Sequence, residues 1–248
     1  MSAKRRNDFT YKDIRKVVRL FSAQYRTNHN VPSLPGDQEL REFRERLYQK
    51  FPNVISLVKK HLRKTSPQEG RGFDHLEEIA VMAGHLAEQE CAFRKIDSPE
   101  NMRIIDQAIL AGLLHDLDRH LGFGEVHMIE GEKSARRILE KEDLVNETVL
   151  TVVRNHDHLG FDPNNDRLLE IIFAAVFDAD HFRYGTERKS EYWEMREKKG
   201  IPPEEVIHDY QFVPPLRDAW RTNYGKRVGP PWIDFAIAIA KHVEQIFT

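Results

Sequence analysis

Cysteine is nearly absent from this sequence of 248 residues, which contains only Cys91. One thiol cannot form an intramolecular disulfide or a thiolate cluster, so a disulfide scaffold and a sulfur-rich zinc site are both excluded. Any metal must therefore be held by nitrogen and oxygen ligands. The low cysteine content also favours a reducing compartment, and we expect a cytoplasmic protein.

Long apolar runs are missing as well. Residues 104–117 are interrupted by Asp106 and His115, and residues 168–177 by Glu170, so neither run is suited to span a bilayer. The basic residues near the N-terminus are not followed by the uninterrupted apolar stretch that a secretory signal requires. We therefore predict neither export nor membrane association.

The sequence also lacks an excess of charge of either sign. Lys and Arg total 38 against 40 for Asp and Glu, which gives a formal net charge of −2. Such a balance provides no long-range field to attract nucleic acid or an anionic membrane. We expect no polymeric nucleic acid and no membrane as a partner, and a homo-oligomer stays open.

Strand-type alternation of Val, Ile and Thr is nearly absent, and almost every segment follows the helical period instead. The pattern predicts an all-α protein with one core and helical extensions. We place the N-terminal extension at residues 1–69, the core at 70–186 and the C-terminal extension, packing on the core, at 187–248. Helices are expected at residues 11–25, 38–64, 74–92, 102–117, 131–142, 146–157, 166–184, 187–199 and 232–247.

The helix expected at residues 102–117 is apolar on nearly all sides, yet it ends in His115 and Asp116. Both residues fall in line with apolar residues one, two and three turns earlier, so both point into packed surroundings. An ionised carboxylate there is unfavourable by on the order of several kcal/mol unless a cation or dense hydrogen bonding compensates. A bound divalent metal is the simplest compensation.

The same spacing test selects three further residues. His75, His156 and Asp180 each lie at the end of an apolar helical stripe. By contrast, His85 and His158 fall outside such stripes and are interpreted as surface or rim histidines.

The order His75, then His115-Asp116, then Asp180 resembles the H…HD…D signature of the HD-domain superfamily, over about residues 70–186. The resemblance implies an HD-domain helical bundle and a metal-dependent phosphohydrolase that uses metal-activated water. The resemblance also implies a small-molecule phosphorylated substrate, a phosphate ester or anhydride, favoured to be a nucleotide. Residues 159–163 depart from the GYP segment of members that act on cyclic dinucleotides, which disfavours that substrate.

Two more histidines resemble the dinuclear branch of this superfamily. His127 precedes Gly131 and an apolar segment as in that branch, and His156 follows a valine-rich helix. Six ligands could then hold two metals about 3.5 to 4 Å apart. The spacing from Asp116 to His127 is short, and His120 is the alternative ligand.

The remaining candidates are polar residues that follow the ligands closely. Arg119 and Arg183 could neutralise phosphate oxygens, and Asp116 would serve in catalysis as well as in metal binding. Asp118 and Asp157 could protonate the leaving group or hydrogen-bond to the ligand histidines. Ligands of this kind suit one or two ions of Mn, Fe, Co, Ni, Zn or, less well, Mg.

Two other classes of protein share these residues. A minority of HD proteins, similar to myo-inositol oxygenase, use a di-iron centre to activate dioxygen, and an oxygen uptake that requires iron would distinguish them. The other alternative is a non-catalytic protein, either a metal-binding sensor or a sensor or scaffold that keeps the fold and has lost the site. The presence of all four core ligands disfavours loss of the site.

Overall fold

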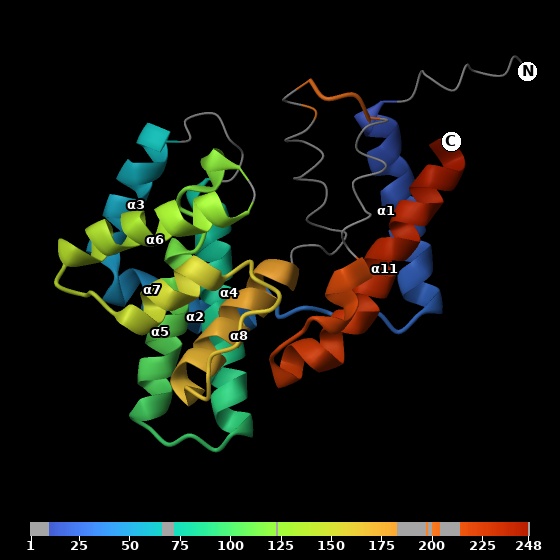
Figure 1. Ribbon diagram of the computed structural model, residues 1–248. Coiled ribbons are helices and arrows are strands. Elements are labelled where there is room, and N and C mark those ends of the chain that lie inside the picture. The colour runs from blue at the N-terminus through green and yellow to red at the C-terminus, as the bar shows by residue number, and fades with distance from the viewer. Residues whose placement is uncertain are drawn as a thin grey trace, which may run out of the picture. The chain divides into compact units, whose positions relative to one another are not determined.

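The computed structural model describes residues 10–65, 72–122, 124–182, 197, 200–203 and 214–247. These residues form nine α-helices and two short 3-10 helices and contain no β-strand (Figure 1), so the predicted all-α class is confirmed. The α-helices are α1 (Tyr11–Asn28), α2 (Asp37–Lys50), α3 (Pro52–Thr65), α4 (Phe73–Phe93), α5 (Glu100–Leu114), α6 (Glu125–Glu140), α7 (Glu147–Asn155), α8 (Arg167–Phe182) and α11 (Asn223–Phe247). The 3-10 helices are η1 (Arg119–Leu121) and η2 (Pro214–Asp218).

The chain divides into two compact units. The site unit contains residues 34–180 and 220–225, and the terminal unit contains the described parts of residues 1–33, 181–219 and 226–248. The boundaries that the sequence places near residues 69 and 186 lie outside the described residues. Helices α2 and α3, which we assigned to an N-terminal extension, belong to the same compact unit as α4 to α7.

Two expected helices differ from the structure at prolines. The helix expected at residues 38–64 is broken at Phe51, and α3 begins with Pro52, a residue well suited to a first helical turn. The last helix, expected to begin at Trp232, instead begins at Asn223 and continues through Pro230 and Pro231. A proline inside a helix removes one backbone hydrogen bond, and here tertiary packing outweighs that loss.

The close packing of α4 against α5 is the feature of the site unit that brings ligands together (Figure 1). Gly112 of α5 faces the α4 backbone, where an added Cβ would lie 2.8 Å from Ala80 Cα. Any larger residue would therefore push the two helices apart. This contact lies three residues before His115 in α5, and in α4 it involves Ala80 and the carbonyl of Ile79, which is one turn after His75.

Residues 220–225 are fixed to α8 and α4 by two buried carboxylates. Asp178 accepts hydrogen bonds from the backbone N–H groups of Arg221 and Thr222 and from the Thr222 hydroxyl. Glu90 accepts two further bonds from the backbone and side chain of Asn223. Burial raises the pKa of Asp178 to about 6, although these donors work in the opposite direction.

The terminal unit has a small core of its own between α1 and α11. Its buried residues are Tyr11, Ile14, Val18, Phe235, Ile239 and Val243. In the same unit the indole of Trp232 donates to the Phe182 carbonyl at 3.0 Å. None of the described helices is both long enough and apolar enough to cross a membrane.

Candidate metal centre

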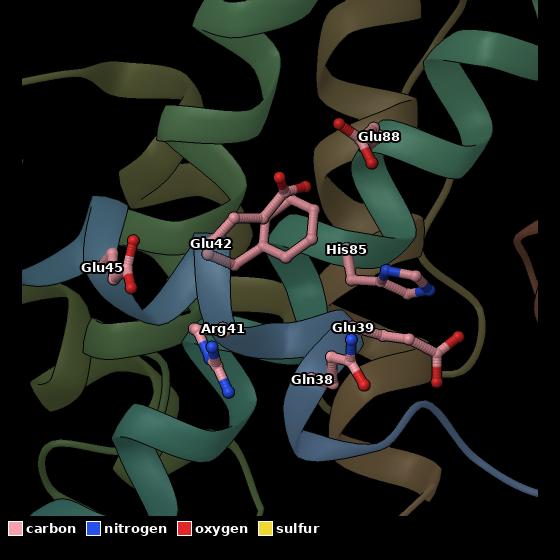
Figure 2. Close-up of a pocket in the computed structure, with 8 residues that line it drawn as sticks. Gln38, Glu39, Arg41, Glu42, Glu45, His85 and Glu88 are labelled. Atoms are coloured by element: carbon pink, nitrogen blue, oxygen red, sulfur yellow. The ribbon is translucent and has the colours of Figure 1, made fainter.

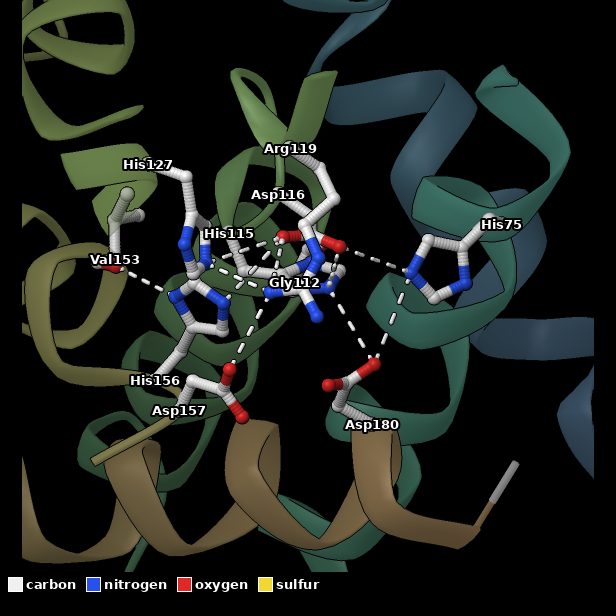
Figure 3. A network of polar contacts seen from close by, with 10 residues as sticks. All are labelled: His75, Gly112, His115, Asp116, Arg119, His127, Val153, His156, Asp157 and Asp180. Carbon is white, nitrogen blue, oxygen red and sulfur yellow. Dashed lines mark hydrogen bonds and ion pairs between the residues drawn. The ribbon is translucent and has the colours of Figure 1, made fainter. Parts of the chain in front are cut away.

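All six ligands expected from the sequence meet in the site unit (Figure 3). Their side chains come from the first turn of α4, the end of α5, the first turn of α6, the end of α7 and the last turns of α8. Five of them are buried, and His75 is half-buried. The six residues are His75, His115, Asp116, His127, His156 and Asp180.

One side of this cluster contains two carboxylates. His75 Nε2 lies 3.8 Å from Asp116 Oδ2 and 3.7 Å from Asp180 Oδ1. His115 Nε2 lies 4.0 Å and 3.6 Å from the same two oxygens. We call these four residues the carboxylate-rich subsite.

The opposite side shares Asp116 but presents its other oxygen. His127 Nε2 and His156 Nε2 lie 3.7 Å and 3.6 Å from Asp116 Oδ1. Arg119 Nη1 is also in contact, 2.9 Å from His127 Nε2 and 3.8 Å from Asp116 Oδ1. We call Asp116, His127, His156 and Arg119 the arginine-containing subsite, and Asp116 joins the two subsites as a bridging carboxylate would.

Backbone carbonyls orient two of the histidines as metal ligands are usually oriented. His115 Nδ1 lies 2.7 Å from the Gly112 carbonyl, and His156 Nδ1 lies 2.8 Å from the Val153 carbonyl. Because a carbonyl only accepts, the proton sits on Nδ1, and in a neutral ring Nε2 keeps its lone pair. His115 Nε2 is buried and has no hydrogen-bond partner among the described residues.

The donor atoms fit a divalent cation. Two ligand atoms bonded at about 2.0–2.2 Å to a tetrahedral ion are about 3.3–3.6 Å apart. The observed separations of 3.6–4.0 Å in the carboxylate-rich subsite require a contraction of only a few tenths of an ångström. The nitrogen and oxygen donors, the buried charge and the unbonded His115 nitrogen all suit such an ion.

The charges of the cluster are strongly coupled. Burial alone would raise the pKa of Asp116, but the interaction with His156 and the nearby positive charge of Arg119 hold that pKa well below its usual value. Burial lowers the pKa of His156, and its partner Asp116 reverses the shift, so that the net change is upward. Asp116 is therefore an ionised carboxylate at neutral pH, as a metal ligand must be.

His127 behaves differently from His156. Its burial, followed by the positive charge of Arg119, lowers the pKa of His127 to about 4. The ring is therefore neutral at pH 7, and its Nε2 accepts the hydrogen bond from Arg119. His127, and not the alternative His120, is the histidine placed beside Asp116.

The two aspartates considered for proton transfer occupy different surroundings. Asp157 lies 3.3 Å from Arg119 Nη1, and 29% of its side chain is exposed. Asp118 is buried and binds His61 of α3 at 2.9 Å and the hydroxyl of Ser134 in α6. Asp118 thus connects α3 and α6, and neither group of ligand atoms that could hold a metal includes it.

His61 was not among the residues predicted from the sequence. It lies seven residues after Val54 and three after Val58, so helical spacing could have placed it on the buried face of α3. The other arginine expected to bind phosphate, Arg183, lies outside the described residues.

The interpretation of His85 as a surface histidine is wrong, whereas His158 is exposed as expected. His85 is only 8% exposed and packs edge-on against Phe43 and Tyr224. It faces a pocket of about 410 Å³ between α2 and α4 (Figure 2). The pocket is lined by Gln38, Glu39, Arg41, Glu42, Phe43, Glu45, His85 and Glu88.

Comparisons with protein-family models, with curated proteins and with solved structures find no match. The all-helical fold and the buried His/Asp cluster are compatible with an HD domain. Membership of that superfamily stays a prediction based on the residues themselves.

Proposed function

We propose that this protein is a metal-dependent phosphohydrolase that cleaves a phosphate ester or anhydride of a small molecule, a nucleotide being the favoured substrate. The observation that supports it most is the convergence of His75, His115, Asp116 and Asp180 from three helices. Such a set of buried imidazoles and carboxylates is a costly arrangement without a cation.

The donor set decides which ions are suitable. Imidazole and carboxylate ligands without thiolate favour Mn, Fe, Co, Ni or Zn over Mg. A divalent cation bound there supplies the activation of water at neutral pH and the stabilisation of developing negative charge.

The protein's own residues provide the rest of the reaction. Arg119 places a positive charge at the side of the cluster, and a guanidinium is a donor that suits phosphate oxygens. Asp157, partly exposed and in contact with Arg119, is placed where a carboxyl group can hold a proton for the leaving group. His115 and His156 are kept in a single orientation by their carbonyl partners.

Elemental analysis of the purified protein, together with a phosphate-release screen across nucleotides, tests this function. We expect bound divalent metal and release of phosphate from at least one phosphorylated substrate, in air or under anaerobic conditions. Oxygen uptake that requires iron, without phosphate release, would replace hydrolysis by the oxygenase reaction.

The control is a pair of variants. His115→Ala combined with Asp116→Ala should remove both metal and activity while the helical circular dichroism spectrum is retained. His158→Ala changes an exposed histidine and should keep the metal. A double variant that still binds metal as the wild type does would contradict the proposal.

A further inference from the structure

The position of Arg119 bears on how many metal ions the cluster can hold. Its side chain is only 9% exposed, and Nη1 lies 2.9 Å from His127 Nε2, 3.3 Å from Asp157 Oδ2 and 3.8 Å from Asp116 Oδ1. The guanidinium therefore lies among the atoms that a second metal would need. Figure 3 shows the guanidinium in contact with His127, Asp116 and Asp157.

The distances leave little room for a second cation. His127 Nε2 and Asp116 Oδ1 are 3.7 Å apart, so a metal bonded to both at about 2.0–2.2 Å would lie about 1 Å from the midpoint of the line that joins them. Arg119 Nη1 lies 2.9 Å from the first of these atoms and 3.8 Å from the second. These three distances place Nη1 about 2.8 Å from the midpoint of the line. Two positive charges at such a separation repel strongly in buried surroundings.

The formal charges lead to the same result. Asp116, Asp157 and Asp180 contribute three negative charges and Arg119 one positive charge, which leaves two negative charges when the histidines are neutral. One divalent cation cancels them. A second would leave two uncompensated positive charges in a buried cluster, which is strongly unfavourable.

We propose that Arg119 is the built-in second cation of this centre, so that the protein binds one divalent ion, in the carboxylate-rich subsite, and excludes a second from His127 and His156. This inference rests on the proposed function. The two histidines then bind no metal: His127 accepts a hydrogen bond from Arg119, and His156, oriented by the Val153 carbonyl, lies 3.6 Å from Asp116 Oδ1.

A fixed guanidinium in place of a second metal has a chemical consequence. Arg119 carries a guanidinium charge, and the planar donors of a guanidinium suit two oxygens of one phosphate. The centre would thus combine one exchangeable cation with one permanent cation on either side of Asp116. Occupancy of a single metal site would be sufficient for full activity.

Counting bound Mn²⁺ on the full-length chain tests the inference. Isothermal titration calorimetry and elemental analysis should give one Mn²⁺ per wild-type chain, with the electron paramagnetic resonance spectrum of an isolated ion. Arg119→Gln and Arg119→Met, which both remove the charge, should bind two ions with the spectrum of a coupled pair. Arg119→Lys retains the charge and should stay at one.

A further variant locates the additional ion. Adding His127→Ala to Arg119→Gln should return the count to one, and circular dichroism verifies that each protein is folded. Two ions in the wild type, or one ion in both neutral variants, would overturn the inference and leave the proposed function intact. No ion in any of the proteins would overturn the proposed function itself.

Discussion

The two subsites share Asp116 but differ in the charge that faces it. On one side Asp180 adds a second carboxylate beside His75 and His115. On the other side Arg119 adds a positive charge beside His127 and His156. Both sides offer two imidazoles at similar distances from an Asp116 oxygen, so the histidines alone do not determine where a cation binds. We expect the neighbouring charge to determine it.

Removal of the shared carboxylate should have the largest effect on metal binding, because it abolishes the difference between the two subsites. Asp116→Asn removes the anionic ligand from both subsites at once, and we expect the affinity for Mn²⁺ to fall by on the order of 1,000-fold or more. Calorimetric titration measures this affinity for Mn²⁺. The matched control is Asp162→Asn, an exposed aspartate, which should bind as the wild type does. An Asp116→Asn protein with unchanged affinity would show that the cluster is not a metal site.

Changing one residue of each subsite should separate them. Asp180→Asn should weaken Mn²⁺ binding by on the order of 100-fold, because it removes a carboxylate from the subsite that we expect to be occupied. His127→Gln should change the affinity by less than about threefold, a difference of under about 0.7 kcal/mol. The two affinities are compared in the same titration. Equal losses in the two variants would mean that both subsites contribute equally to binding.

A change in the packing of α4 against α5 should weaken metal binding in the carboxylate-rich subsite only. Gly112→Ala places a Cβ 2.8 Å from Ala80 Cα, and we expect the free energy of unfolding to fall by about 1–3 kcal/mol, with weaker metal binding. Gly131→Ala is the matched control, because its Cβ would meet neighbours only at 3.8 Å and beyond. That change should stabilise α6 by up to about 1 kcal/mol. Urea unfolding of both variants measures the difference.

Much of the site could be predicted because its ligands lie on apolar helical stripes. His75, His115, Asp116, His156 and Asp180 each interrupt such a stripe, and a local pattern is enough to find them. The fold class followed from the same period. The charge balance between the subsites could not be predicted, because the placement of Arg119 against His127 depends on the path of the chain through η1.

Long-range contacts and tertiary packing account for the other differences. Asp118 is close to Asp116 in sequence and was predicted as a candidate for catalysis. Its carboxylate is instead bound by His61 and Ser134, which lie 57 positions before it and 16 after it. His85 lies off the stripe of His75 but is covered by Phe43 and Tyr224. The start of α11 before two prolines is likewise determined by packing and not by propensity.

The smallest expected effect is a change in the titration of His127 in metal-free protein. Its pKa of about 4 lies below the usual value of 6.5, so the unfolded chain binds a proton in this range and the folded chain does not. His127 therefore lowers stability as the pH falls from about 6.5 to about 4, and leaves it undiminished above 6.5.

Arg119→Gln removes the second cause of the low pKa of His127 and leaves burial, the larger cause, in place. We expect an upward shift of less than one pKa unit, under about 1.4 kcal/mol, measured by NMR titration after chelation of metals. A His127 resonance that titrates identically in both proteins would show that the guanidinium does not act on this ring, and that the two subsites differ in something other than charge.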